Sequence, residues 1–407
     1  MLYLYTLQLE KLEKKGYKLC MNQIKPMLLT TLKSYDRSQF VKDVTAGIIV
    51  AIIALPLSIA LALASGVGPQ AGIFTAIVAG FVISAFGGSS VQIAGPTAAF
   101  ATIVAGIVAK DGLDGLVIST ILAGIFLILM GLCHFGSLIK FIPYTITTGF
   151  TSGIAVTIVI GQLKDFFGVT YPNGLKPIET MEKLNAFALG FSSFHVDALI
   201  VGGVSLAILI ISPYIFKRIP GSLIAVVIGI LMVKFLPLHV STIGNLYTIT
   251  NDLPSFHIPA VKFSMVKSAI PNAFTIAVLA AIESLLSCVV ADGMINGKHR
   301  SDTELVAQGL GNIASALFGG IPATGAIART AANIKNGGRT PVAGIVHSVT
   351  LVIVLVVLMP FAGMIPMPTI AAILFIVAYN MCQWRTFTIW CAPLRRATSL
   401  YCSPHSF

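Results

Sequence analysis

Long apolar stretches alternate with short polar segments along most of the chain. Residues 44–63, 116–132, 198–215, 222–236 and 342–359 each approach the ~20 residues that a helix needs to cross a bilayer. One hydrophobic core cannot explain so many of these stretches. The pattern predicts twelve membrane-spanning segments, at 44–66, 70–87, 91–108, 113–132, 142–164, 196–215, 219–236, 271–290, 304–319, 321–336, 341–360 and 366–381.

Two segments are short and interrupted by glycine and proline, namely 90–108 (SVQIAGPTAAFATIVAGIV) and 320–336 (GIPATGAIARTAANIKN). Each is typical of an extended stretch followed by a half-helix. The extended stretches, at 91–94 and 321–323, cannot expose unpaired backbone groups to lipid, so we expect them to be buried against protein at mid-membrane depth. Irregular backbone at that depth is typical of a binding site.

Similar short sequences precede both broken segments, Ser-Ala-Phe-Gly-Gly at 84–88 and Ser-Ala-Leu-Phe-Gly-Gly at 315–320. This similarity suggests an internal repeat. The broken segments are the third and the tenth, and because they lie an odd number of spans apart, the second copy is inverted relative to the first. Corresponding broken helices in inverted halves are typical of the midplane site of a transporter.

The composition favours the bilayer as the solvent of this chain. With 56% hydrophobic residues, 10% charged residues and a mean hydropathy of +0.92, a water-soluble protein would have too few polar groups to cover its surface. The net charge of +11 is spread over the loops instead of forming one face. Membrane topology explains that charge better than a nucleic-acid partner does.

Basic residues before the first span predict a cytoplasmic N-terminus in a multi-pass protein of the bacterial inner membrane. They are Lys11, Lys14, Lys15, Lys18, Lys25, Lys33, Arg37 and Lys42. The first span is an uncleaved anchor on this interpretation, and both Met1 and Met21 remain candidate starts. The six cysteines have no paired metal spacing, so we expect neither a disulfide framework, a zinc site nor a cofactor.

Five motifs in this order resemble the sulfate permease (SulP) family of anion transporters, over residues 40–384. They are Ala54-Leu-Pro-Leu57, Ile93-Ala-Gly-Pro-Thr97, Glu283-Ser-Leu-Leu-Ser287 with Ala291-Asp292, Gly325-Ala-Ile-Ala-Arg-Thr330, and Gly337-Gly-Arg-Thr-Pro-Val-Ala-Gly344 with His347. The resemblance implies an all-α inverted-repeat fold of the 7+7 type, divided into a core and a gate domain. A nucleobase-cation symporter of the same fold is the alternative.

The C-terminal part departs from the pattern of that family. If the second repeat has the length of the first, we expect it to be incomplete by about 60 residues, roughly two spans, and we expect the family's STAS domain to be missing. We therefore expect a truncated chain with a cytoplasmic N-terminal segment at 1–43, a transporter domain at 44–384 and an aberrant tail at 385–407. The family resemblance also suggests a homodimer, which the STAS domain usually assists.

The two half-helices are expected to direct free backbone N–H groups and positive dipole ends into one cavity, which suits an anion. The candidate amides belong to Thr97, Ala98, Ala99, Gly325, Ala326 and Ile327. The alternative is that these small residues only permit tight helix packing. By resemblance, Leu57 lines the same cavity together with Pro56 and Ala60.

Arg329 lies in the first turn of the second half-helix. A cation at that depth is costly unless it faces a cavity or a partner. Arg329 either adds positive potential for the anion, or extends toward the cytoplasmic face, or pairs with a carboxylate such as Glu283. His134 and His347 have no neighbours in the sequence that suggest a metal site, and loop or packing roles are expected for them.

Glu283 stands alone in the apolar run 273–290, one turn from Ser287. By resemblance, this pair forms the coupling-ion site beside the second half-helix. Sodium-coupled relatives add a hydroxyl from the tenth span, where this chain has Ile327. A hard cation prefers several oxygen ligands, whereas a carboxyl group removed from water takes up a proton more readily. We therefore expect coupling to protons instead of sodium.

The resulting hypothesis is secondary active transport of a small inorganic oxyanion, of the sulfate or bicarbonate class or a dicarboxylate. A passive anion channel is the second hypothesis, because the same core would conduct if its gate leaked. We expect no enzyme, since Glu283 is the only carboxylate assigned to a span interior and the sequence contains no HExxH, GxSxG or P-loop motif.

Overall fold

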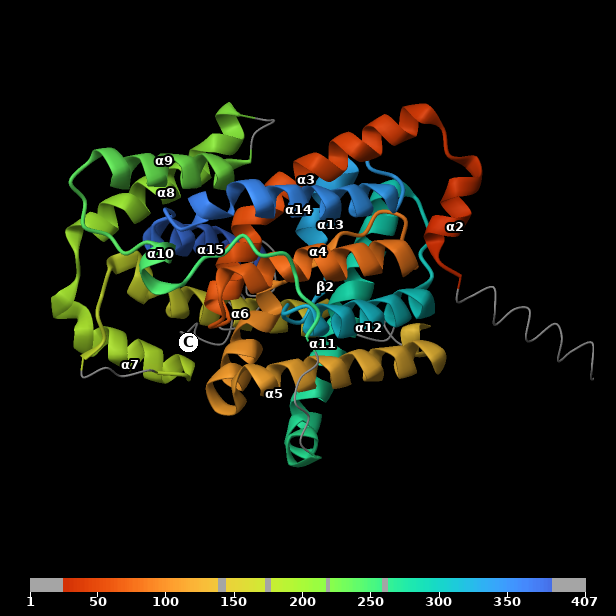
Figure 1. The fold of residues 1–407 in the computed structure, drawn as a ribbon, viewed down its shortest axis with the longest axis horizontal. Helices are drawn as coiled ribbons and strands as arrows, with labels where there is room; N and C mark the ends of the chain where they lie inside the picture. Colours follow the sequence, from red (N-terminus) through yellow and green to blue (C-terminus); the bar gives the residue numbers. More distant parts are fainter. Residues whose placement is uncertain (1–24, 138–143, 173–176, 217–219, 258–262, 383–407) are drawn as a thin grey trace, which may run out of the picture.

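The computed structural model describes residues 25–137, 144–172, 177–216, 220–257 and 263–382. The predictions for the first twenty residues and for the tail 385–407 lie outside these ranges. The described chain consists of helices and one two-stranded sheet (Figure 1), in the order α2(Met27–Thr31), η1(Leu32–Ser34), α3(Arg37–Ala64), α4(Pro69–Phe86), β1(Ala94–Gly95), α5(Ala98–Leu132), α6(Tyr144–Phe167), α7(Thr180–Gly190), η4(Phe191–Ser193), α8(Val196–Ile215), α9(Gly221–Phe235), α10(Ile243–Leu246), α11(Phe263–Ile295), α12(Ser301–Leu317), β2(Thr324–Gly325), α13(Ile327–Lys335), α14(Val342–Ala362) and α15(Met367–Met381).

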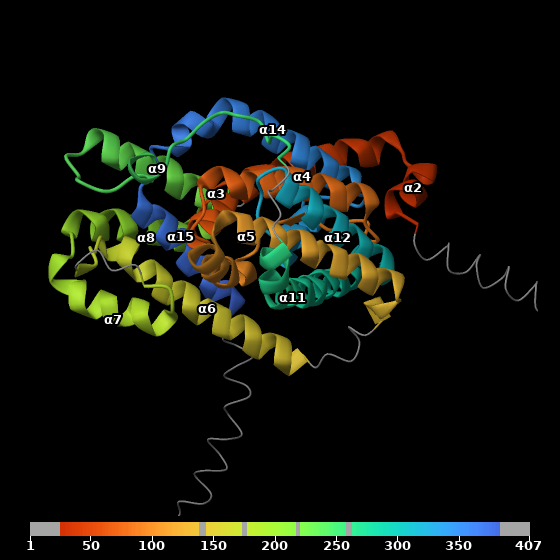
Figure 2. The ribbon, with the colours of Figure 1, turned by 60° about the horizontal axis from the view of Figure 1, so that its bottom comes forward.

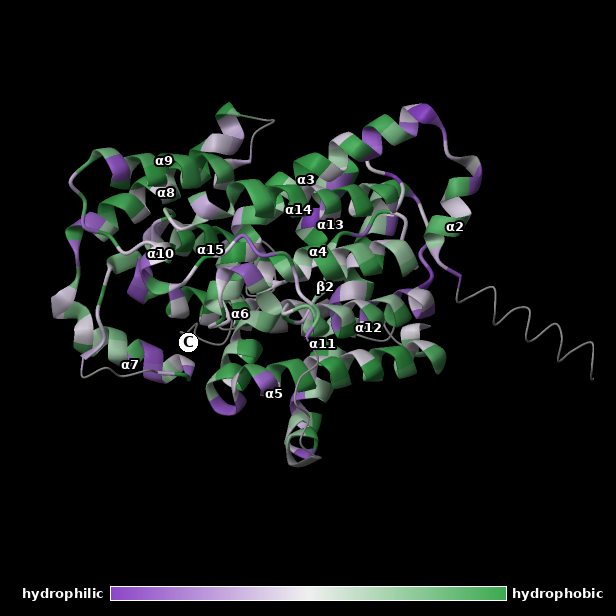
Figure 3. Ribbon diagram, in the orientation of Figure 1, coloured by the Kyte–Doolittle hydropathy of each residue, from purple (hydrophilic) through white to green (hydrophobic). Residues whose placement is uncertain are grey.

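The described ranges contain six helices that are long and apolar enough to cross a membrane, namely α3, α4, α5, α8, α11 and α14. The shorter helices α9 and α15 are also apolar. Figure 3 shows that apolar residues predominate along these helices, while polar residues gather near helix ends and in connections. The prediction of an all-α polytopic membrane protein is confirmed.

Most predicted spans correspond to helices, and the exceptions have physical reasons. The predicted break between 108 and 113 is a kink at Gly112 inside α5, where φ is 72°, a conformation that glycine adopts without steric cost. Helix α11 begins at Phe263 instead of 271, because its first turns contain polar residues such as Lys267 that hide them from an apolar pattern. Helix α7 was not predicted, because its residues lie in the loop expected between the spans 142–164 and 196–215.

The helices form two groups that lie side by side (Figures 1 and 2). The larger group consists of α3, α4, α5, α11, α12, α13 and α14, and the smaller group of α6, α7, α8, α9 and α15. Within the larger group α12 packs on α5 and α4, and α14 packs on α3 and α4. Helices α3 and α5 also contact α6, so the two groups meet along these elements.

The two extended stretches meet inside the larger group. Strands β1 and β2 pair antiparallel, with Ala94 opposite Gly325 and Gly95 opposite Thr324. The flanking side chains of Val91, Ile93 and Ile321 are at most 2% exposed. The prediction that both stretches are buried against protein is therefore confirmed. Because each strand leads into a helix, the pairing brings the N-terminal ends of α5 and α13 together.

Helices α5 and α12 approach each other closely at a pair of glycines. A Cβ added to Gly124 would lie 2.6 Å from the carbonyl oxygen of Gly309, and a Cβ on Gly309 would lie 2.5 Å from that of Gly124. Small residues at such contacts let helix backbones pack tightly inside a membrane. The contact holds α12 in place beneath the paired strands.

We predict that Gly124→Ala lowers the free energy of unfolding by about 1–3 kcal/mol, because the added methyl group overpacks the contact with Gly309. The measurement is thermal unfolding in detergent. Gly203→Ala in α8 is the matched control, since nothing lies within 4 Å of a Cβ at that position. Equal melting temperatures for the two variants would contradict a tight contact between α5 and α12.

Candidate functional site

A cavity of about 310 Å³ lies where the N-terminal ends of α5 and α13 meet. Both helix groups contribute to its wall, since Thr148 comes from α6 and Asn380 from α15. The lining residues are Leu57, Leu61, Pro96, Thr97, Ala98, Ala99, Thr148, Thr151, Glu283, Leu286, Gly325, Ala326, Ile327, Ala328, Arg329, Val377, Asn380 and Met381. All eight residues that the sequence assigned to substrate line this one cavity.

The two helix ends at the cavity have no side-chain cap. Thr97 is the N-cap residue of α5 but makes no capping hydrogen bond, and its hydroxyl instead donates to Glu283 Oε2 at 2.9 Å. The N-cap residue of α13 is Ala326, which has no polar side chain. The first amides of a helix lack acceptors within that helix. Those of Ala98 and Ile327 therefore suit an anion in the cavity.

Two of the predicted amides are already engaged. The N–H of Ala326 donates to the carbonyl oxygen of Ile93 at 2.9 Å, and that of Gly325 donates to Ser284 Oγ at 3.4 Å. The expectation that these two amides are free to face an anion is corrected, because the backbone beside strand β1 uses one of them and Ser284 of α11 uses the other. Both residues still line the cavity, so their contribution is its shape and not their N–H groups.

Arg329 is a buried cation whose hydrogen bonding is incomplete. It is 2% exposed, and its Nη2 donates to the carbonyl oxygen of Pro96 at 2.8 Å. Within the described residues, its Nε and Nη1 have no hydrogen-bond partner and it forms no ion pair with Glu283. Of the three roles considered for Arg329, pairing with Glu283 is therefore not observed among the described residues, and Arg329 lines the cavity.

A glycine makes room for this guanidinium. A Cβ on Gly95 would lie 2.3 Å from Arg329 Nη1. Gly95 precedes Pro96, whose carbonyl oxygen accepts from the same side chain. The strand β1 thus holds Arg329 at the start of α13, next to the uncapped end of α5.

Glu283 is less isolated than its apolar surroundings suggest. The Thr97 hydroxyl is its hydrogen-bond donor, and the sequence could not show this because the two residues are 186 positions apart. Ser287 lies outside the cavity wall, fully buried, and its hydroxyl contacts Thr330 Oγ1 at 3.5 Å. The two predicted coupling residues therefore have different surroundings.

The burial of Glu304 was not predicted. Glu304, at the start of α12, is 0% exposed and accepts four hydrogen bonds. The predicted span 304–319 begins at Glu304. In the sequence, Glu304 therefore looks like an ordinary acidic residue in the first turn of a helix.

Both histidines have the loop and packing roles that were expected. His134 lies in the turn after α5 and contacts Asp302 Oδ2 at 2.8 Å through its Nδ1. His347 lies in α14 and is fully buried. In the described residues no group of three or more His, Cys, Asp or Glu side chains could hold a metal ion.

Comparison with known proteins identifies the class. Residues 40–397 match the model of the "Sulfate permease family". YvdB of Bacillus subtilis (strain 168) is 43% identical over 357 residues, which cover 86% of this chain and 66% of YvdB. The bicarbonate transporter BicA of Picosynechococcus sp. (strain ATCC 27264 / PCC 7002 / PR-6) is 33% identical over 353 residues, which cover 84% of this chain and 62% of BicA. The chain thus spans slightly less than two thirds of these relatives.

A solved structure supports the same assignment. The transmembrane domain of a cyanobacterium bicarbonate transporter BicA aligns with a TM-score of 0.78 and 30% identity, over 86% of this chain and 90% of that one. The fold and these matches define a multi-pass membrane protein, and BicA is named as a bicarbonate transporter. The chain belongs to the sulfate permease family.

We predict that Arg329→Met abolishes the rise in melting temperature that sulfate or bicarbonate gives the unaltered protein, because ligand-linked stabilisation requires the binding group. Without anion, the variant should unfold within about 1 kcal/mol of the unaltered protein, since the lost guanidinium is desolvated and incompletely paired. Arg300→Met is the control, as Arg300 bonds Lys25 and Thr30 far from the cavity wall. An undiminished anion effect in Arg329→Met would remove Arg329 from the site.

Proposed function

We propose that this chain performs secondary active transport of a small oxyanion, of the sulfate or bicarbonate class or a dicarboxylate, with protons as the coupling ion. The observation that carries the proposal is Arg329, a buried guanidinium that lines a cavity where two helix ends without a side-chain cap also lie. An oxyanion in the cavity would be attracted by this charge and would accept hydrogen bonds from the guanidinium and from the first amides of the two helices. Charge-assisted hydrogen bonds of this kind are among the stronger ones in proteins.

The shape of the site supports a compact substrate. The wall is largely apolar apart from the two helix ends, Arg329, Glu283 and a few hydroxyl and amide side chains. A small inorganic anion can be held by backbone N–H groups and a guanidinium without further polar contacts. The names of the family and of BicA are consistent with sulfate and bicarbonate as the first anions to test.

We predict that purified protein in liposomes accumulates labelled sulfate or bicarbonate, that each of the two anions competes with the other, and that uracil has no effect. The physical reason is that the Arg329 guanidinium and the positive dipole ends of two helices favour negative charge in the cavity, which uracil does not carry. Accumulation against a gradient, lost when the pH gradient collapses, distinguishes transport from a passive channel. Competition by uracil without any effect of anions would instead favour a nucleobase symporter.

Protons are the proposed coupling ion because oxygen ligands near Glu283 are few. The Ser284 and Thr324 hydroxyls bond each other, and Ser287 contacts Thr330. Ile327, at the cavity wall, adds only backbone groups. A hard cation prefers several oxygens, whereas a proton needs only the carboxylate. The Thr97 hydroxyl can rotate, and so it can donate to the ionised carboxylate or accept from the protonated one.

We predict that Glu283→Gln abolishes uptake driven by a pH gradient but retains anion exchange, because the amide mimics the protonated carboxyl group and cannot release a proton. The measurement compares both activities in liposomes at matched protein density. Glu179→Gln, at the exposed start of α7, is the control that keeps the same charge change. Uptake by the unaltered protein that depends on sodium and not on pH would contradict proton coupling.

A further inference from the structure

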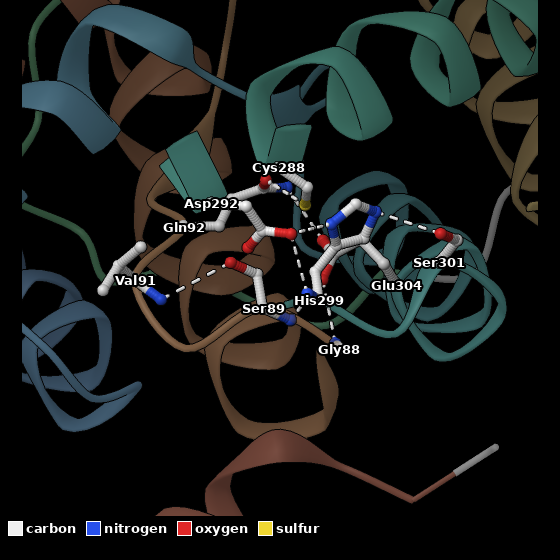
Figure 4. Close-up of polar contacts among 9 residues, drawn as sticks. All are labelled: Gly88, Ser89, Val91, Gln92, Cys288, Asp292, His299, Ser301 and Glu304. Atoms are coloured by element: carbon white, nitrogen blue, oxygen red, sulfur yellow. Dashed lines mark hydrogen bonds and ion pairs between the residues drawn. The ribbon is translucent and has the colours of Figure 1, made fainter. Parts of the chain in front are cut away.

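The carboxylate of Glu304 is the centre of a buried polar cluster outside the cavity wall (Figure 4). Its Oε2 accepts from the backbone amides of Gly88 at 2.9 Å and Ser89 at 3.2 Å. Its Oε1 accepts from Nε2 of Gln92 and Nε2 of Gln308, both at 2.8 Å. All four partners donate N–H groups, which matches an ionised carboxylate, since that form is an acceptor only.

The Gln92 side chain is held at both ends of its amide group. Its Nε2 donates to Glu304 on α12, and its Oε1 accepts from the Cys288 thiol on α11. Figure 4 shows the Gln92 amide between these two partners. Because a carboxylate cannot donate, the Glu304 contact determines which end of the amide carries the NH₂ group. Two helices therefore set the orientation of one side chain.

This oriented amide lies directly against the strand crossing. A Cβ on Gly325 would lie 2.1 Å from Gln92 Nε2 and 2.4 Å from its Cδ. Gly325 pairs with Ala94 in the sheet and immediately precedes Ala326, the N-cap residue of α13. Gln92 thus contacts the backbone at Gly325, two residues before α13 begins at Ile327. The first turn of α13 contains Arg329.

We propose that Gln92, anchored by Glu304, is a positioning residue for the cavity. This inference rests on the proposed function only where anion transport is the quantity measured. Gln92 does not line the cavity. It acts through Gly325, whose backbone it holds against the strand pairing, and so it fixes where the uncapped end of α13 and the Arg329 guanidinium meet the uncapped end of α5. A shift of this backbone would misplace both anion-binding elements together.

A matched pair of variants separates positioning from general stability. Gln92→Leu and Gln308→Leu each remove a hydrogen bond of 2.8 Å to Oε1 of Glu304. Gln92→Leu also removes the acceptor of the Cys288 thiol, and the atoms nearest to a Cβ on Gly325 are those of Gln92. We expect Gln92→Leu to raise the half-saturation concentration for sulfate or bicarbonate by about tenfold, as loss of supporting contacts around a site typically does. Gln308→Leu should stay within about twofold of the unaltered protein.

An exchange of the two side chains tests the contact itself. Glu304→Gln combined with Gln92→Glu again places a carboxylate, now at position 92, opposite an amide, now at position 304. The side-chain amide of Gln308 can flip, so that its Oε1, which has no partner among the described residues, accepts from the new amide at position 304. We expect each single exchange to raise the half-saturation concentration and the double exchange to recover most of the loss. Recovery in the double variant is an effect that a merely destabilising change would not give.

Hydrogen exchange provides a readout that does not depend on anion transport. The Ala326 amide, bonded to Ile93, should exchange at least about tenfold faster in Gln92→Leu than in Gln308→Leu, because loosening of the crossing opens that bond. This holds even if the unaltered protein transports neither anion, so failure of the proposed function would be recognised separately. Equal exchange rates and equal half-saturation values in the two leucine variants would overturn the proposal.

Discussion

Backbone polar groups at the two helix breaks impose the constraint on which the rest of this structure depends. The interior of a bilayer offers no water to satisfy them, so each unpaired group would cost several kcal/mol. Strands β1 and β2 satisfy part of the requirement by pairing with each other. Polar side chains from neighbouring helices satisfy more of it, through Thr75, Asn312, Thr330 and Asn333. The polar residues of the larger helix group are thus concentrated where the helices are broken.

Three charged residues of the larger helix group show how differently such groups can be accommodated in one domain. Glu304 accepts four N–H groups and is fully supplied with partners. Glu283 lines the cavity with one hydroxyl as donor, and Arg329 keeps two nitrogens unpaired. A charged group that already has all its hydrogen-bond partners is stabilised little by a ligand. A charged group that lacks partners is stabilised more. The distinction separates the structural carboxylate from the two groups that we assign to anion and proton binding.

The sequence was informative about local pattern and less so about distant contacts. Apolar lengths and the glycine and proline interruptions predicted most of the spans and the buried extended stretches, whereas the break near Gly112 is a kink inside one helix. Family motifs added Leu57 to the cavity. Use of the Gly325 and Ala326 amides within the protein was not predictable, because their acceptors, Ser284 Oγ and the carbonyl oxygen of Ile93, come from other segments of the chain. Glu304 was missed for the same reason, since its partners Gly88 and Gln92 lie in the other half of the repeat.

The shortness of α13 has a consequence for how the protein is made. Its nine residues span about 14 Å, less than half of the ~30 Å hydrocarbon layer, and they include Arg329 and Lys335. Such a segment does not partition into lipid during synthesis by its own hydrophobicity. Its hydrogen-bond partners Ile93 and Val91 are synthesised 237 and 242 residues earlier. Helix α13 therefore docks onto a surface prepared by previously inserted helices, and the cavity is completed only after most of the chain is already in the membrane.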